Sequence, residues 1–195
     1  MLKGRLISLK TAEKEDLPEI YKIVLEDGMG GAFSTTYYEN TLSNLHNLLF
    51  ETENGTQSKA FVIKLKEKTI GFITLNDIHP IRRSAAIGNL GILKEYQKKN
   101  EKSFLNTSYA IEAGGILMIY AFEILNLHKL TASTFSDNSN VDKLYLNGGW
   151  TKEGISRDYI PRNGKWLDKN EWGILRIEYD NHMNYKKLKE FINWK

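Results

Sequence analysis

YAFEILNLHKLTASTFSDNSNVDKLYLNGGW, residues 120–150, is the stretch that decides the fold class of this 195-residue chain. It starts in an apolar helix, continues into a strand expected at residues 129–134, and passes through a turn rich in Asp, Asn and Ser. A short helix follows and ends at Gly148-Gly149, where glycine supplies the left-handed backbone typical of a helix end. Together with a strand expected at residues 85–93, this gives a strand, helix, strand unit. The stretch therefore predicts a mixed α/β domain.

The first half of the chain fits the same class. A first strand is expected within residues 2–9, and a helix opens at Thr11 with acidic residues in its first turn. A glycine-rich loop over residues 26–36 leads to a second amphipathic helix at about residues 37–50. Alternating apolar residues then predict three antiparallel strands, the first two forming a hairpin, at residues 60–65, 69–76 and 85–93.

The second half adds a buried helix and a C-terminal hairpin. The helix expected at about residues 108–125 is apolar nearly all round, so it should lie inside the protein. Asn163-Gly164 separates two strand-like runs and predicts a hairpin, whose second run reaches residues 172–179 and whose Trp166 and Trp172 should pack within it. No repeat or linker is visible. We therefore expect one domain over residues 1–195, with a last helix at about 184–194 as an extension.

Composition narrows the functional classes. A hydrophobic fraction of 41%, 11% aromatic residues and a net charge of +3 describe a soluble globular chain. Basic and acidic residues are interleaved, so no nucleic-acid partner is expected. The absence of cysteine excludes disulfides, cysteine nucleophiles and thiolate metal sites, and no metal site is predicted. No apolar run has the length of a signal peptide or a membrane span, so a cytoplasmic location is expected. The expected assembly is a monomer or a homodimer.

Residues 138–150 also carry a known motif. They resemble the Asn-x-x-x-x-x-Leu-Tyr-x-x-x-Gly-aromatic signature of the GCN5-related N-acetyltransferases (GNATs). The flanking segments 120–122 and 125–129 are similar to the branch that contains the ribosomal-protein N-terminal and spermidine acetyltransferases. The resemblance implies a single GNAT-like domain of α+β type, with a mixed central sheet flanked by helices. It also implies an enzyme that moves an acetyl group from acetyl-CoA to a primary amine by direct attack. The acceptor would be a small molecule, an amino sugar or a peptide N-terminus.

The resemblance assigns roles to the residues of the motif. Tyr145 would protonate the departing thiolate and contact the cofactor, and Asn138 would bind the cofactor. From helical periodicity alone, Tyr145 belongs to an apolar stripe of the core, and Asn138 is equally suited to cap a helix. The pantetheine arm would be held, and the thioester carbonyl polarised, by backbone groups of Gly91, Ile92 and Leu93.

The phosphate-binding loop departs from the family. The usual pattern is Gln/Arg-x-x-Gly-x-Gly/Ala at the start of the buried helix, where backbone amides favour an anion. An ungapped alignment matches only Ala110. An alignment on Glu95-Tyr96-Gln97 instead places an insertion at residues 98–105, and in both cases Ser108 replaces the glycine. The resemblance still implies a cofactor loop composed of Asn106, Thr107, Ser108, Tyr109 and Ala110.

The general base also departs from the family. Related enzymes often carry glutamate in Ser-Ala-Glu-Ile-Gly, whereas this chain has Ala86 at the glutamate position. Asp77 and His79 are candidate bases, and the ordinary pKa of histidine near neutrality suits that role. Both residues also fit a plain turn, and a chain of water molecules could deprotonate the amine instead.

Two other classes of function remain open at the level of sequence. The altered loop and the missing glutamate are compatible with a non-catalytic acyl-CoA-binding or regulatory module that has kept the fold. A basic protein associated with RNA or the ribosome is a third possibility, and its binding would weaken steeply with salt.

Overall fold

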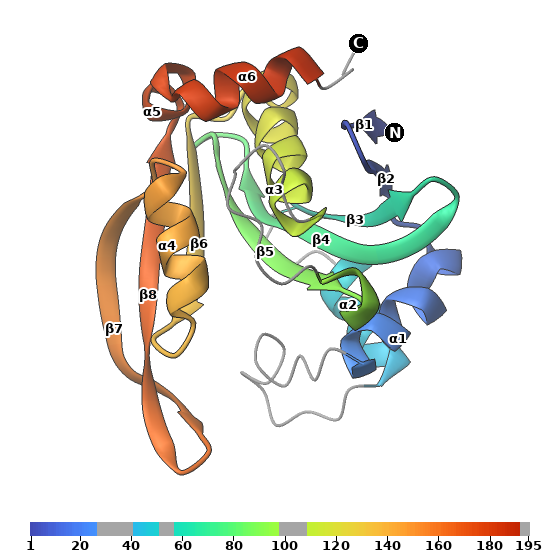
Figure 1. The fold of residues 1–195 in the computed structure, drawn as a ribbon. Helices are drawn as coiled ribbons and strands as arrows, with labels where there is room; N and C mark the ends of the chain where they lie inside the picture. The colour runs from blue at the N-terminus through green and yellow to red at the C-terminus, as the bar shows by residue number, and fades with distance from the viewer. Residues whose placement is uncertain (27–40, 51–56, 98–108, 192–195) are drawn as a thin grey trace.

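An eight-stranded mixed sheet forms the centre of the computed structural model, which describes residues 1–26, 41–50, 57–97 and 109–191 (Figure 1). The strand order is β1-β2-β3-β4-β5-β6-β8-β7, and every neighbouring pair is antiparallel except β5 and β6. The strands are β1 (Leu2–Lys3), β2 (Ser8–Thr11), β3 (Gln57–Leu65), β4 (Lys68–His79), β5 (Ser84–Ile92), β6 (Lys129–Phe135), β7 (Thr151–Arg162) and β8 (Lys165–Leu175).

Helices cover both faces of the sheet. The first face carries α1 (Leu17–Glu26), preceded by a short 3-10 turn, and α2 (Leu42–Phe50). The opposite face carries α3 (Tyr109–Ile119), which continues as a π-helical turn (Tyr120–Ile124), and α4 (Ser139–Asn147). Helices α5 (Arg176–Asn181) and α6 (Met183–Phe191) lie across the end of α3 (Figure 1). This arrangement agrees with the predicted mixed sheet flanked by helices.

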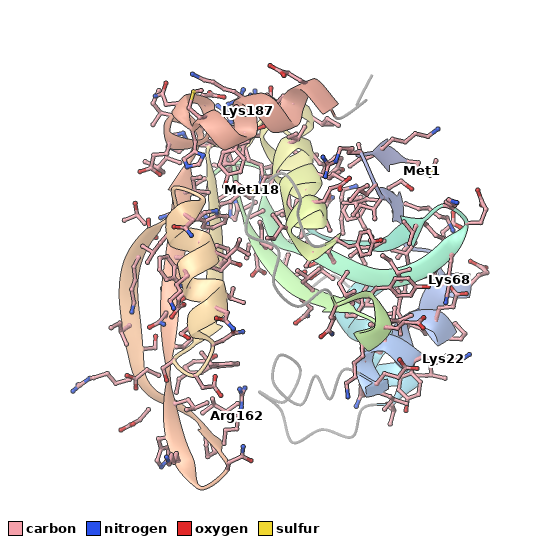
Figure 2. The ribbon with its side chains drawn as sticks, in the orientation of Figure 1. Met1, Lys22, Lys68, Met118, Arg162 and Lys187 are labelled. Carbon is pink, nitrogen blue, oxygen red and sulfur yellow. The ribbon has the colours of Figure 1, made fainter. Side chains whose placement is uncertain are left out.

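Alternation along the central strands supplies the two hydrophobic cores. On β3, Phe61 and Ile63 face α3, whereas Ala60 and Val62 face α1 and α2. Each fully buried Val, Ile or Phe side chain contributes about 1.5–3 kcal/mol to the free energy of unfolding. Figure 2 shows Met118 inside the molecule, while the charged side chains of Lys22 and Lys187 project outward.

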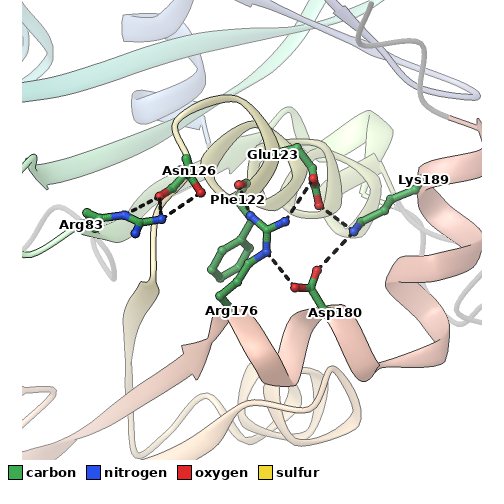
Figure 3. Close-up of polar contacts among 7 residues, drawn as sticks. All are labelled: Arg83, Phe122, Glu123, Asn126, Arg176, Asp180 and Lys189. Atoms are coloured by element: carbon green, nitrogen blue, oxygen red, sulfur yellow. Dashed lines mark hydrogen bonds and ion pairs between the residues drawn. The ribbon is translucent and has the colours of Figure 1, made fainter.

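The contact between β5 and β6 is short. Only residues 84–86 of β5 pair with residues 129–131 of β6, and the two strands then separate as β5 continues to Ile92 (Figure 1). The Nε atom of Arg83 donates to the carbonyl of Asn126 at 2.8 Å next to the paired end (Figure 3). The two strands are therefore joined at one end, called the closed end here, and leave an opening between them at the other end.

A β-bulge lies on β5 beyond the paired end. The register between β4 and β5 shifts between Ile73/Leu90 and Leu75/Ile87, which leaves one extra residue on β5. The Asn89 amide, within the bulge, donates to the hydroxyl of Thr74 at 2.9 Å. Bulges of this kind redirect a strand and are common next to active sites.

Several predicted elements are confirmed, and some boundaries were wrong. The two hairpins, the strand at 129–134 and the short helix after it are all present. The last strand does not reach residue 179, because the chain turns into α5 at Arg176. The Glu178 carboxylate accepts the Leu175 amide at 2.7 Å, and the Arg176 amide donates to the His128 carbonyl at 2.8 Å. These hydrogen bonds begin a helix where the apolar pattern predicted a strand.

Two further expectations are corrected. The first strand is two short strands, because the buried carboxylate of Glu112 accepts the Leu6 amide at 2.8 Å and so holds a turn between β1 and β2. Trp172 packs inside as expected, with 2% of its surface exposed, but Trp166 is 61% exposed on β8. The predicted loop at 26–36, the start of the second helix and residues 192–194 of the last helix lie almost entirely outside the described residues.

Candidate active site

Tyr145 lies on α4 beside the point where β5 and β6 separate. Its ring centroid is 4.8 Å from that of Trp150 and 5.7 Å from that of Trp172. Trp172 is paired with Ala132, the residue that directly follows the last β6 residue paired with β5. The aromatic packing therefore places the half-buried Tyr145 over β8, next to the β6 residue that marks the apex of the opening between β5 and β6.

The surroundings of Tyr145 keep its phenol neutral. Burial raises its pKa above the ordinary value, and the neighbouring Tyr185 and Asp142 raise it further. Each of these effects disfavours the tyrosinate anion. Among the described residues, none forms a hydrogen bond with the Tyr145 hydroxyl. The group is thus a protonated donor that is not committed to a described neighbour.

A polar network fixes α4 to the sheet next to Tyr145. The Thr134 hydroxyl donates to the Asp142 carboxylate, and the Asn170 amide donates to the same carboxylate at 2.9 Å. The Trp172 indole N–H donates to the Thr134 hydroxyl at 3.0 Å. Sequence reasoning missed this network. Its only signal was that Asp142 lies three residues before Tyr145, and therefore on the same side of the helix.

The backbone of β5 presents alternate residues to the opening. The Leu93 amide donates to the Ile70 carbonyl of β4 at 2.9 Å, so this amide is not available to a ligand. Successive residues of a strand direct their amides to opposite edges, which also directs Gly91 toward β4. The alternation leaves the backbone amides of Leu90 and Ile92 facing the opening. Of the three predicted backbone positions, only Ile92 has this orientation, and Leu90 joins it.

The predicted phosphate loop is only partly described. Asn106, Thr107 and Ser108 lie outside the described residues, whereas Tyr109 and Ala110 form the first turn of α3. The Gln97 side-chain amide donates to the Ile92 carbonyl at 2.7 Å. This contact fixes the end of β5 on the side of the opening.

Asn138 occupies the position before the first turn of α4. Its carbonyl accepts the amides of Val141 and Asp142, but its exposed side chain makes no capping hydrogen bond. The side-chain amide is therefore open to solvent at the N-terminus of α4. A plain capping role does not account for this conformation.

The two candidate bases lie at the end of β4, beside the segment of β5 that pairs with β6. Asp77 is exposed, with a left-handed φ of 52°, and the His79 Nδ1 atom accepts the Arg82 amide at 3.2 Å. His79 pairs with Ser84, the first residue of β5. At the position of the missing glutamate, Ala86 pairs with Asn76. The structure thus places both candidate bases at the end of β4, where Asp77 lies at a register shift and His79 contacts the turn that follows.

The fold and this arrangement are those of an acyltransferase that uses acyl-CoA. Comparison with known proteins identifies the family. Residues 9–171 match the model of the Acetyltransferase (GNAT) domain, so the chain belongs to the GNAT acetyltransferase family. The predicted family and fold class are confirmed.

Individual relatives agree with this assignment. The chain is 26% identical to the spermidine N(1)-acetyltransferase of Vibrio cholerae over 177 residues, which cover 90% of this chain and 96% of that protein. It is 32% identical to the uncharacterized N-acetyltransferase YoaA of Bacillus subtilis over 108 residues, 55% of this chain and 54% of the relative. The matched segments thus span about half of this relative and of YnaD, another from B. subtilis.

A solved structure extends the similarity to the fold. The Vibrio cholerae spermidine N-acetyltransferase in complex with CoA and spermine superposes with a TM-score of 0.73 at 26% identity, covering 90% of this chain and 99% of that one. In the described part of the chain, no helix is both long and apolar enough to span a membrane.

Proposed function

We propose that this protein transfers an acetyl group from acetyl-CoA to a primary amine by direct attack, with Tyr145 as the acid that protonates the departing thiolate. The observation that carries the proposal is the position of Tyr145 beside the apex of the opening between β5 and β6. The raised pKa keeps the phenol protonated at neutral pH, so a proton is present when the thiolate develops beside it.

The backbone of β5 supports the same reaction. The free edge from Ile87 to Ile92 is ~17 Å long at the usual rise per residue, which suits an extended ligand such as a pantetheine arm. Amides of Leu90 and Ile92 face the opening and would donate to carbonyl oxygens there. An amide already held by the strand can stabilise the oxyanion of acyl transfer without reorganisation. Asn138, with its side chain unbonded at the start of α4, would contact the cofactor from the other side.

The acceptor must lose a proton before it attacks, since an alkylammonium has no free electron pair. Asp77 and His79 remain candidates for this step, and ordered water is the alternative that needs no side chain. The spermidine N(1)-acetyltransferases among the relatives make polyamines the first acceptors to test, followed by amino sugars and peptide N-termini. The expected cytoplasmic location and the monomeric or dimeric state remain predictions, as does the extent of the domain over residues 1–195.

Replacing Tyr145 by Phe tests the proposal. The change removes the proton donor and keeps the ring on Trp150 and Trp172, so kcat should fall at least about tenfold. The Kd for CoA, measured by calorimetry, should change less than about twofold because the packing is retained. Tyr159→Phe is the matched control, since Tyr159 lies half-exposed on β7.

Two outcomes would remove the proposal. Equal effects of Tyr145→Phe on kcat and on CoA binding would show that the phenol is a structural group. Thermal stabilisation by acetyl-CoA without acetylation of any amine in a panel of polyamines, amino sugars and peptides would identify a non-catalytic acyl-CoA-binding module.

A further inference from the structure

Helix α6 reaches back to the helix that carries Tyr145. The match to the family model ends at residue 171, and α5 and α6 follow it. Tyr185 of α6 is 3% exposed, and its hydroxyl donates to the carbonyl of Gly148 at 2.7 Å. Gly148 directly follows the last residue of α4 and caps the helix. A side chain from outside the matched segment thus bonds to the end of the helix that holds the candidate acid.

The bonded carbonyl belongs to the same turn as Tyr145. The Gly148 amide donates to the carbonyls of Leu144 and Tyr145 at 2.9 and 3.0 Å, and the Trp150 amide donates to the Tyr145 carbonyl at 3.0 Å. These bonds make residues 144–150 one hydrogen-bonded unit. Holding the Gly148 carbonyl therefore restrains the backbone of Tyr145.

Gly149, the next glycine, lies in close contact with the segment that joins α5 to α6. Gly149 has a φ of +77°, and a Cβ atom added there would lie 2.7 Å from Cδ2 of His182. The imidazole of His182 occupies the space that a side chain would need. The close approach of α5 and α6 to the end of α4 therefore depends on glycine at this position.

Tyr185 is itself anchored to α3. Its ring lies 5.0 Å from that of Tyr179, which stacks on Phe122 at 4.5 Å. Around this stack, Glu123 forms ion pairs with Arg176 at 3.3 Å and with Lys189 at 2.6 Å (Figure 3). The pair α5–α6 thus connects the end of α3 to the end of α4, the two helices on the face that carries the opening.

We propose that Tyr185 is a positioning residue, which holds the last turn of α4 so that the Tyr145 hydroxyl stays beside the apex of the opening. This inference rests on the proposed acid role of Tyr145. It gives the C-terminal helices a part in the reaction, although they lie beyond the matched family segment.

The test replaces one buried hydroxyl at a time. Tyr185→Phe keeps the ring stack and removes the bond to Gly148, so kcat should fall about three- to tenfold while the KM for acetyl-CoA stays within about twofold. Tyr179→Phe is the matched control: its hydroxyl is buried in the same stack and has no hydrogen-bond partner among the described residues. This variant should keep the kcat of the unaltered protein.

A double variant separates positioning from general loss of structure. If Tyr185 acts through Tyr145, then Tyr185→Phe should have no further effect on kcat in a Tyr145→Phe background. An equal fall in both backgrounds would overturn the inference, as would an unchanged kcat for Tyr185→Phe alone.

A second measurement keeps the inference distinct from the proposed function. Amide hydrogen exchange at residues 148–150 should be faster in Tyr185→Phe than in Tyr179→Phe, whatever the activity. Equal exchange in the two variants would overturn the positioning role. If Tyr145→Phe retains full kcat while exchange differs as expected, the acid assignment fails, and Tyr185 then holds α4 without serving a proton transfer.

Discussion

The carboxylate of Asp142 accepts a hydrogen bond from the side-chain amide of Asn170 at 2.9 Å, and the two residues lie 28 positions apart in the sequence. Asn170 is 5% exposed on β8, directly opposite Thr134 on β6, whose hydroxyl binds the same carboxylate. One acidic side chain of α4 therefore satisfies polar groups from two strands at once. Because Tyr145 follows on the next turn, this contact sets how α4 lies on the sheet.

Removing this carboxylate should weaken the fold. Asp142→Ala leaves the buried polar groups of Thr134 and Asn170 without their acceptor, which should lower the free energy of unfolding by about 1–3 kcal/mol. Asp137→Ala is the control, because Asp137 forms a partly exposed ion pair with Arg162 and should cost at most about 1 kcal/mol. Urea unfolding at neutral pH measures both. Equal losses would mean that the network adds nothing beyond a surface pair.

Alanine should have opposite effects at two glycines. Gly149→Ala meets a φ of +77° and the ring of His182, so it should destabilise the protein by more than about 1 kcal/mol. Gly114→Ala adds a methyl group in α3 where, apart from the helix's own backbone, no atom of the described residues lies within 4 Å, and it should stabilise by about 0.5–1 kcal/mol. Thermal unfolding of the two variants provides the comparison. A neutral Gly149→Ala would argue against the close approach of His182.

The ion pairs at the end of α3 should contribute more to the free energy of unfolding than those on the surface. Glu123, with a side chain 16% exposed, pairs with both Arg176 and Lys189, and its loss should cost about 1–3 kcal/mol (Figure 3). Glu123→Gln tests this, with Glu95→Gln as the control, because Glu95 and Lys68 are more than half exposed. The control should change stability by less than about 0.5 kcal/mol. A larger effect at Glu95 would contradict the ranking.

Stability should fall in alkali as buried tyrosines titrate. Burial raises the pKa of Tyr185 to about 12, above the value of about 10 for the unfolded chain. A folded pKa above the unfolded one means that stability is complete below pH 10 and is lost as pH rises toward 12. The loss should be on the order of 2 kcal/mol. Tyr185→Phe should reduce the slope of stability against pH in this window, and an unchanged slope would contradict the assignment.

The sequence predicted the elements whose signals are local. Alternating residues gave the β3–β4 hairpin, Asn163-Gly164 gave the β7–β8 hairpin, and the motif placed Asn138 and Tyr145 around α4. The end of β8 was wrong because the helical start at Arg176 depends on a hydrogen bond to His128, a residue 48 positions earlier.

In the site, too, the sequence predicted what depends on local signals and missed what depends on contacts between distant segments. The motif brought Tyr145 into consideration, whereas the bond from Asn170 to Asp142 and the bond from Tyr185 to Gly148 join segments that no short pattern connects. The direction of each β5 amide likewise depended on the register with β4 and on the bulge at Asn89. A shift of one residue exchanges the amides that face the opening for those that face β4.

The three-residue pairing between β5 and β6 gives this sheet two inner edges in addition to its outer ones. Unpaired strand edges attract any extended chain with amide groups, including a strand of another protein. A ligand lying along Leu90 and Ile92 would take the place of a missing strand and join the two halves of the sheet through itself. Saturation with such a ligand should then raise the temperature at which the sheet unfolds, because the ligand adds hydrogen bonds between the halves to the closed end and the shared hydrophobic core.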